Sequence, residues 1–345
     1  IHIIGTNGKG TTGRFLATAL FKRGYSVGHY TSPHILSFNE RIWFNGSDVS
    51  MELLEETHKA LLSLLTQEEA EALSYFEYTT LLAMLFYSDK SDFVVLEAGL
   101  GGEHDATAVF ANELTLVTPI DKDHEAFLGS DIQSIATTKL AAIQKAAVIA
   151  KQKHSLVYEV LREVEKEKHI QTYKAEELLD LSDEQNIATI AKREQLAPYL
   201  QENLSLAIAA MKYLDITYVS SDFFDARLFG RLSVLEKNIL VDVGHNILAA
   251  ESIVKSLKNK KYNLVYNSFG DKNYKEILRV LKPIINEVEL IDVSNVRVAE
   301  SSYLQNTLDA LEIQYSKFTK IQNDKEYLVF GSFSVVEAFL KVQRG

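Results

Sequence analysis

Short apolar runs alternate with longer helical patterns along the whole chain, and this alternation constrains the fold more than any other feature. The expected strands are residues 1–4, 25–30, 40–46, 92–99, 114–120, 146–151, 238–244, 262–270, 288–294 and 326–332. Helical patterns cover 9–23, 51–65, 69–88, 131–144 and 202–214, and the polar stretch 176–199 is typical of solvated helix and loop. Repeated strand–helix alternation predicts an α/β protein with parallel sheets.

The chain has 345 residues, which is too long for one ordinary core and fits two domains. Strand–helix alternation restarts after a polar stretch, so we expect the boundary at about 220–230. The predicted domains are residues 1–222 and 228–345. The chain begins directly in a strand-like run without methionine, which leaves no room for a signal peptide and predicts a natural N-terminal extension.

Composition excludes several classes of function. Apolar residues make up 46% and charged residues 24%, as in ordinary globular proteins, and the net charge is −11. An acidic surface repels phosphate backbones, so we expect no nucleic-acid partner. The absence of cysteine excludes disulfides, thiolate nucleophiles and cysteine-based zinc sites, and it fits a reducing, cytoplasmic location. No apolar run approaches the roughly 20 residues of a membrane span, so we expect no membrane partner.

The first expected strand runs into the glycine-rich stretch "GTNGKGTT", residues 5–12. The common P-loop has a hydroxyl residue directly after its lysine, whereas here Gly10 separates Lys9 from Thr11. A glycine loop between a strand and a helix lets backbone N–H groups approach phosphate oxygens. We therefore expect Lys9 to reach the terminal phosphates and Thr11 to hold Mg²⁺. The alternative is a plain glycine-rich turn.

Further polar residues follow other expected strands, where ligands of open α/β sheets bind. Glu97 ends the run "DFVVLEAG", a candidate central strand, and is placed to bind Mg²⁺. Asp121, Asp123 and His124 follow the next strand. Lys139 lies on a mainly apolar helix, where a lysine usually extends its ammonium to solvent. The second half contributes Asp242, His245, Asn246, Asp271 and Lys272.

Taken in order, these stretches resemble the folylpolyglutamate synthase/dihydrofolate synthase family of the Mur-ligase superfamily. The resemblance rests on "GTNGKG", followed about twenty residues later by "TSPH" and "ERI", then on "LEAGLGG", "DH…LG", "ENLSLAIAAM", "GRLSVL" and "DVGHN". These stretches span nearly the whole chain. The family usually has Arg where Glu103 stands, Asn where Ala108 stands and Pro where Ile247 stands.

The resemblance implies an N-terminal P-loop ATPase-like domain of the Mur-ligase central type and a smaller C-terminal Rossmann-like domain, with ATP between them. It implies an ATP-dependent ligase that joins a pteroate or folate carboxylate to L-glutamate through an acyl phosphate. The implied partners are small molecules, namely dihydropteroate or a reduced folate and L-glutamate. A monomer is also implied.

The resemblance assigns a role to each matching residue. Lys9, Lys139 and His124 are implied to be catalytic, and Lys139 matches a lysine that CO₂ can carbamylate. The implied ATP-binding residues are Gly5, Thr6, Asn7, Gly8, Lys9, Gly10, Thr11, Thr12, Asn203, Arg231, Asp242 and His245. The resemblance implies two Mg²⁺ ions, and their implied ligands are Thr11, Glu97, His124 and carbamylated Lys139. A monovalent cation is a further cofactor that the resemblance allows. The implied substrate residues are Ser32, Pro33, His34, Arg41, Asp271 and Lys272.

Three other functions stay open at this point. A Mur-type ligase acting on another acid differs only in its substrate, and "TSPH" with "ERI" favours the folate branch. A P-loop kinase or motor-like ATPase makes no amide bond. A non-catalytic nucleotide-binding protein would be expected to lack the metal ligands, yet Lys9, Thr11, Glu97 and His124 are all present. The sequence does not separate dihydropteroate from folate as the acceptor.

Overall fold

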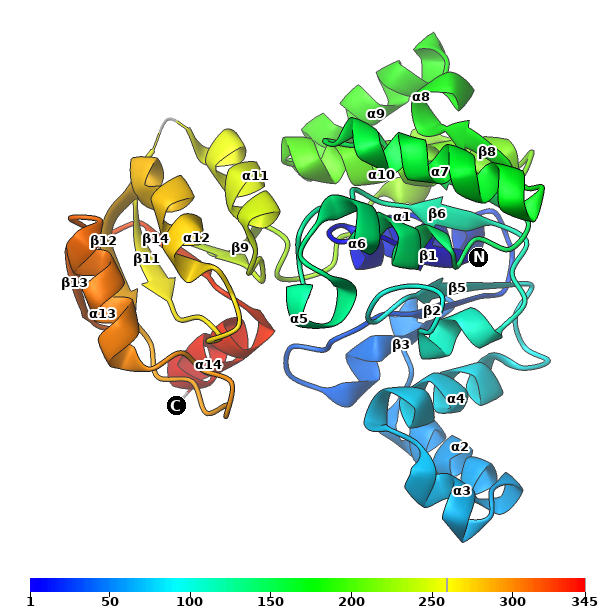
Figure 1. Cartoon of the computed structure of the whole chain (residues 1–345), viewed down its shortest axis with the longest axis horizontal. Coiled ribbons are helices and arrows are strands. Elements are labelled where there is room, and N and C mark those ends of the chain that lie inside the picture. Colours follow the sequence, from blue (N-terminus) through cyan, green and yellow to red (C-terminus); the bar gives the residue numbers. More distant parts are fainter. Residues whose placement is uncertain (259, 345) are drawn as a thin grey trace. The chain divides into compact units, whose positions relative to one another are not determined.

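The computed structural model describes residues 1–258 and 260–344, with the side chain of residue 126 also left out. It divides the chain into two compact units, Ile1–Arg227 and Leu228–Gly345 (Figure 1). Residues 259 and 345 belong to the predicted second domain and lie outside the described residues. Each unit contains one mainly parallel sheet with helices, so the predicted α/β class is confirmed.

The first unit has an eight-stranded sheet in the order β4-β3-β2-β5-β1-β6-β7-β8. The β2–β3 and β3–β4 pairs are antiparallel, and the other pairs are parallel. The strands are β1 (His2–Ile4), β2 (Val27–Tyr30), β3 (Ile42–Phe44), β4 (Ser47–Asp48), β5 (Phe93–Glu97), β6 (Thr115–Val117), β7 (Ala146–Ile149) and β8 (Gln171–Lys174). The carboxyl ends of β1, β5 and β6 therefore meet in the middle of the sheet.

Ten α-helices and three short 3₁₀ turns accompany this sheet in the described residues. The helices are α1 (Lys9–Lys22), α2 (Met51–Leu64), α3 (Gln67–Ala72), α4 (Tyr75–Tyr87), α5 (Glu125–Leu128), α6 (Ile132–Leu140), α7 (Ser155–Lys168), α8 (Ala175–Leu178), α9 (Leu181–Glu194) and α10 (Pro198–Tyr213). The 3₁₀ turns are η1 (Phe38–Arg41), η2 (Ala106–Val109) and η3 (Ser220–Phe223). Helix α1 packs against α10 and η3.

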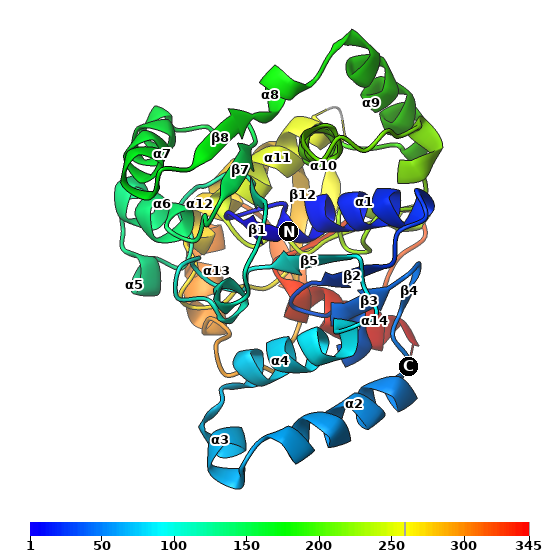
Figure 2. The ribbon, with the colours of Figure 1, turned by 90° about the vertical axis from the view of Figure 1, so that its right-hand side faces the viewer.

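Two neighbouring residues of β2 show that α1 and α4 cover opposite faces of the sheet. Gly13 of α1 packs against His29, whereas Gly28 packs against Tyr87 of α4. Successive strand residues point to opposite faces, so the two helices lie on either side (Figure 2). The helix that follows the glycine loop is thereby held against a buried sheet.

Among its described residues, the second unit has a six-stranded sheet in the order β13-β12-β11-β14-β10-β9, in which only the β9–β10 pair is antiparallel. Its strands are β9 (Ser233–Glu236), β10 (Ile239–Asp242), β11 (Tyr262–Tyr266), β12 (Ile285–Leu290), β13 (Tyr315–Lys317) and β14 (Tyr327–Phe330). Its helices are α11 (Ile247–Leu257), α12 (Tyr274–Leu281), α13 (Ser301–Ala310) and α14 (Phe333–Arg344), with a 3₁₀ turn η4 (Lys282–Ile284).

The predicted helix over 69–88 was wrong in its extent, because two helices occupy this stretch. Helix α3 ends before Leu73, and Ser74 begins α4 as its N-cap. The Ser74 side chain accepts from the N–H of Glu77, and the Glu77 carboxylate accepts from the N–H of Ser74 at 2.7 Å. This reciprocal capping stabilises a new helix start. Strands β8, β9 and β13 were also missed, and α6 ends at Leu140 instead of 144.

Within the described residues, no helix is both long and apolar enough to cross a membrane.

The glycine-rich turn after β5 packs directly on α6. A Cβ atom added at Gly102 would lie 2.6 Å from the carbonyl oxygen and 2.8 Å from the Cα of Lys139. The Glu103 N–H donates to the carbonyl of Thr138 at 3.2 Å, which fixes the turn in this position. The turn therefore has no room for a side chain at Gly102.

We predict that Gly102→Ala destabilises the protein by about 1–3 kcal/mol, because backbone atoms of α6 cannot move aside as a flexible side chain can. Urea unfolding measures the difference. Gly270→Ala is the matched control, since its added Cβ would meet atoms only at 3.8 Å and beyond. Equal unfolding midpoints for Gly102→Ala and wild type would contradict this packing.

Candidate active site

The glycine loop leaves the carboxyl end of β1 and enters α1 as the sequence predicted. Gly5 has a φ of 135°, and a Cβ there would lie 2.8 Å from the carbonyl oxygen of Thr118. Gly8 has a φ of 93° and is the N-cap of α1. Only glycine adopts these conformations without strain. Gly8 also packs against the side chain of Asn203 on α10, so this predicted ATP-binding residue lies at the loop.

Two lysines converge on the carbonyl oxygen of Gly5. The ammonium of Lys9 donates to this oxygen at 3.2 Å and to the carbonyl of Thr6 at 3.3 Å. The ammonium of Lys139 reaches the same Gly5 oxygen at 3.0 Å from α6. Lys139 is only 5% exposed, so its ammonium does not extend to solvent as a surface lysine would.

Burial, together with the nearby charge of Lys9, lowers the pKa of Lys139 from its ordinary value of 10.5 to about 7. The carboxylates of Asp123 and Asp105 act in the opposite direction but do not offset the burial. Near neutral pH, Lys139 therefore exists in part as a neutral amine, which is a nucleophile.

The first turn of α1 contains buried hydroxyl groups that have no hydrogen-bond partner in the structure. Thr11 is 1% exposed, and neither its hydroxyl nor that of Thr12 contacts another polar protein group. Buried polar groups are normally paired, so an unpaired hydroxyl points to a ligand that completes it. A helix N-terminus favours an anion, and a hydroxyl oxygen suits Mg²⁺.

Glu97 lies at the end of β5, beside β1, where Ile3 is its register partner. The side chain is 6% exposed. Its Oε2 accepts hydrogen bonds from the Thr31 hydroxyl and, at 3.0 Å, from the N–H of Ser32. The predicted metal ligand therefore contacts the predicted substrate segment directly.

The predicted substrate segment, which begins at Ser32, is held by residues of η1. The Nε of Arg41 donates to Nδ1 of His34 at 2.8 Å, and the guanidinium lies over the ring of Tyr75 at 5.3 Å. The carboxylate of Glu40 accepts from three successive N–H groups, those of residues 35–37, at 2.7–2.9 Å. Ser32 and Pro33 join through a cis peptide bond. Four predicted substrate residues thus lie in one ordered segment.

His124 begins α5 as its N-cap, with a left-handed φ of 53°. Its N–H donates to Oδ1 of Asp123 at 2.8 Å. The carboxylate of Asp123 acts to raise the pKa of Lys139, which itself contacts the glycine loop. The segment after β6 therefore lies near enough to this loop to influence its charges.

The remaining predicted residues lie in the second unit: Asp242 and His245 at the end of β10, Asp271 and Lys272 in the segment after β11, and Arg231 just before β9. Asp242 is 4% exposed and accepts from the N–H groups of Leu232 and Gly244, each at 2.8 Å. The Arg231 guanidinium lies 5.1 Å from the centre of the Phe333 ring, and Nδ1 of His245 lies 3.1 Å from the carbonyl of Val243. Asp271 forms an ion pair with Arg297 at 2.9 Å, and Lys272 beside it is 9% exposed.

Known proteins resemble this chain over nearly its whole length. No family model matches the chain. The dihydrofolate synthase/folylpolyglutamate synthase of Haemophilus influenzae is 30% identical over 99% of this chain and 88% of that protein. The chain belongs to the dihydrofolate synthase/folylpolyglutamate synthase family. The predicted family resemblance is thereby confirmed.

Solved structures of this family share the fold. A Helicobacter pylori folylpolyglutamate synthetase is 37% identical, with a TM-score of 0.80 over 99% of this chain and 88% of that one. Escherichia coli FolC in complex with DHPP and ADP is 25% identical, with a TM-score of 0.84 over 99% and 88%. The dihydrofolate synthase/folylpolyglutamate synthase fold, a P-loop ATPase-like unit followed by a smaller Rossmann-like unit, is therefore the fold of this chain.

Asp105 was not among the residues predicted from the sequence, yet its side chain shapes the turn after β5. Its carboxylate accepts from the N–H of Leu100 at 2.8 Å and from the N–H and hydroxyl of Thr107 at 3.0 and 2.6 Å. The hydroxyl of Thr107 also lies 2.8 Å from Nε2 of His2. An aspartate that bonds the backbone two residues later is a common turn signal, so "DAT" could have shown this role.

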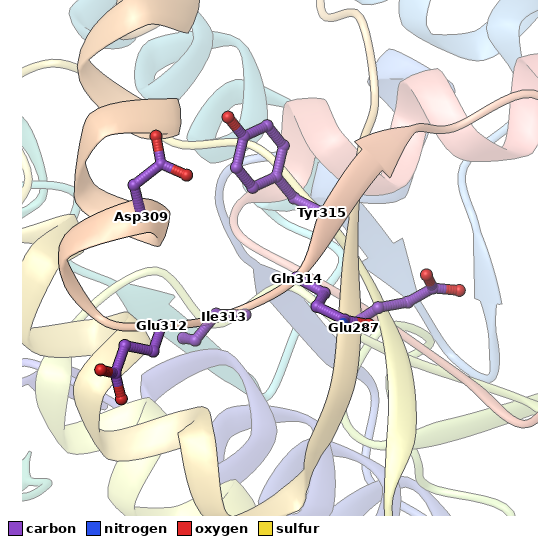
Figure 3. A pocket seen from close by; sticks show the side chains of 6 residues that line it. All are labelled: Glu287, Asp309, Glu312, Ile313, Gln314 and Tyr315. Atoms are coloured by element: carbon purple, nitrogen blue, oxygen red, sulfur yellow. The ribbon is translucent and has the colours of Figure 1, made fainter.

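A separate surface pocket of about 600 Å³ lies in the second unit and contains none of the predicted site residues. It is lined by Glu287, Asp309, Glu312, Ile313, Gln314 and Tyr315 (Figure 3). The three carboxylates in Figure 3 point in different directions instead of converging. Among the described residues, no group of three or more histidine, aspartate or glutamate side chains is arranged to hold a metal ion.

We predict that Lys139→Met changes the stability of this synthase family member in a pH-dependent way. Between pH 7 and 10.5 the unfolded chain binds more protons at this lysine than the folded protein, so wild-type stability rises with pH across that window. Methionine fills similar space without the charge. The stability of the variant relative to wild type should therefore be highest below pH 7 and fall by at most roughly 1.4 kcal/mol per pH unit above it.

Urea unfolding at pH 6, 8 and 9.5 measures this difference. Lys151→Met, at an exposed lysine, is the control and should follow wild type at every pH. A difference between Lys139→Met and wild type that stays constant with pH would contradict the lowered pKa.

Proposed function

We propose that this chain is an ATP-dependent ligase that joins the carboxylate of dihydropteroate or a reduced folate to the amino group of L-glutamate. The observation that carries the proposal is the glycine loop, where Lys9 and Lys139 converge on Gly5 beside the unpartnered hydroxyl of Thr11. The presence of ADP and DHPP in the related FolC structure supports it. Membership of the synthase family favours it over a Mur-type ligase for another acid.

The proposed reaction has two steps. A carboxylate oxygen of the pteroate or folate attacks the γ-phosphorus of ATP, forming an acyl phosphate as ADP leaves. The amino nitrogen of glutamate then attacks the acyl carbon, loses a proton and expels inorganic phosphate, which leaves the amide. The Lys9 ammonium would stabilise negative charge on the transferred phosphoryl group by exchanging its carbonyl partners for phosphate oxygens. We assign the nucleotide phosphates to the loop of residues 5–12.

The residues at the loop fit a divalent metal. Thr11 offers a hydroxyl oxygen. Thr31 and Ser32 donate to Oε2 of Glu97, so we assign Oε1 to the metal. Bound Mg²⁺ would neutralise charge on the phosphate oxygens. We assign His124 and Lys139 to a second Mg²⁺ site, and a monovalent cation completes the proposed ions.

Carbamylation would convert Lys139 from a cation into an oxygen ligand. The neutral amine attacks the carbon of CO₂, and loss of one proton from nitrogen leaves a carbamate with one negative charge. Burial and the lowered pKa support this step, because the neutral amine is the reactive form. A carbamate beside Lys9 would also replace a repulsive pair of cations with an attractive one.

The remaining residues are proposed to bind the organic parts of the reactants. We assign Asn203, Arg231, Asp242 and His245 to the nucleotide, and the segment Ser32–His34 with Arg41 to the pterin substrate. Asp271 and Lys272 complete the proposed substrate residues. We further propose domains over 1–222 and 228–345 and a monomer that works in the cytoplasm with these small molecules alone.

We predict that the natural full-length protein forms a glutamylated product when Mg-ATP, labelled glutamate and either dihydropteroate or tetrahydrofolate are supplied. Lys9→Ala should reduce turnover at least a hundredfold, because one preorganised charge at a transferring group contributes about that much. Lys22→Ala, which removes a lysine from the last turn of the same helix, is the control. Radiochemical product separation measures both.

Two results would contradict the proposal. ADP that accumulates without a glutamylated product would favour a kinase or ATPase. Full activity in Lys9→Ala would exclude the role of the loop in phosphoryl transfer.

A further inference from the structure

The loop that follows β7, residues 150–154 (the β7 loop), contacts the segment that follows β6. Gln152 is 8% exposed, and its Oε1 accepts from the N–H of Ile120 at 2.9 Å. Its Nε2 donates to the carbonyl of Ala150 at 2.9 Å, and its backbone N–H donates to the hydroxyl of Tyr158. The β7 loop is therefore a rigid support for residue 120, although no residue of this loop has a role in the proposed reaction.

The β7 loop also places two basic groups on the carboxylate of Asp121. Nε2 of His154 donates to Oδ1 at 3.0 Å, and the ammonium of Lys153 lies 3.5 Å from Oδ2. Asp121 is 8% exposed, while the side chain of His154 is 32% exposed. A hydrogen bond to a buried carboxylate holds its geometry better than a contact between two exposed side chains.

The backbone of Asp121 is in turn bonded to the glycine loop. The hydroxyl of Thr6 donates to the carbonyl of Asp121 at 2.9 Å and accepts from its N–H at 3.1 Å. The N–H of Thr6 donates to the carbonyl of Pro119 at 2.9 Å. The carbonyl of Thr6 accepts from the ammonium of Lys9. A continuous set of contacts therefore joins His154 to Lys9 through Asp121 and Thr6.

We propose that His154 and Asp121 are positioning residues of the glycine loop. Their hydrogen bond fixes the backbone of residue 121, which fixes Thr6 and, with it, the carbonyl groups that place the Lys9 ammonium. Neither side chain touches the proposed reacting atoms. The inference rests on the proposed function, because it concerns how tightly this loop binds a nucleoside triphosphate.

The test compares Mg-ATP binding and steady-state kinetics for wild type, His154→Ala, His154→Gln, Thr6→Val and the Thr6→Val/His154→Ala double variant. We expect His154→Ala to weaken Mg-ATP binding about tenfold and to raise KM for ATP. KM for glutamate should change by less than about twofold, and the melting temperature by less than about 2 °C. His154→Gln retains an N–H donor and should recover most of the affinity. Lys151→Ala, an exposed lysine of the same loop, is the control.

The double variant tests the route. If His154 acts through Asp121 and Thr6, the Thr6→Val/His154→Ala double variant should bind Mg-ATP no more than about twofold more weakly than Thr6→Val alone. The proposal would be overturned if His154→Ala left the affinity for Mg-ATP unchanged. It would also be overturned if the loss of affinity in the double variant equalled the product of the losses in the two single variants. Wild type that fails to bind Mg-ATP would instead overturn the proposed function, and this inference with it.

Discussion

The carbonyl oxygen of Gly5 accepts hydrogen bonds from two lysines that come from different helices, and the arrangement of the candidate active site depends on this convergence. Lys9 reaches it from α1 at 3.2 Å and Lys139 from α6 at 3.0 Å. The sheet makes the meeting possible, because β1, β5 and β6 are neighbours whose carboxyl ends coincide. Gly5 must be glycine, since its φ of 135° and the nearby carbonyl of Thr118 leave no room for a Cβ.

Bringing two ammonium groups to one oxygen has an electrostatic cost, which falls on the more buried lysine. The pKa of Lys139 is lowered to about 7, mainly by burial and further by Lys9. A protein with a net charge of −11 thus has a locally positive centre at the start of α1, as a phosphate-binding site requires. The buried, unpartnered hydroxyl of Thr11 lies in the same turn and is suited to a metal bound to those phosphates.

Much of this could be predicted from the sequence because the relevant signals are local. A strand, a glycine loop and a helix are adjacent in the chain, so residues 5–12 identified both the loop and its position in the fold. The family resemblance added the order of the later strand ends, from Glu97 to His124. The predicted class of fold and the family are confirmed, whereas the roles of individual residues remain predictions.

What the sequence did not indicate depends on contacts between distant residues or on short capping signals. The pair of His154 and Asp121 joins residues 33 positions apart, and no local pattern marks it. The break at Ser74 had a local signal, a serine followed three residues later by Glu77, but the apolar periodicity on either side concealed it. The edge strands β8 and β13 are short and partly exposed, so they lack the apolar run that identified the central strands.

The central claim, that this loop activates a carboxylate by phosphorylation, is tested most directly by following oxygen. The pteroate or folate substrate is labelled with ¹⁸O in the reacting carboxylate, and the inorganic phosphate released during turnover with Mg-ATP and glutamate is analysed by mass spectrometry. An acyl phosphate requires one substrate oxygen to leave with each phosphate, so the account predicts one ¹⁸O per phosphate formed. Amide product accompanied by unlabelled phosphate would contradict it.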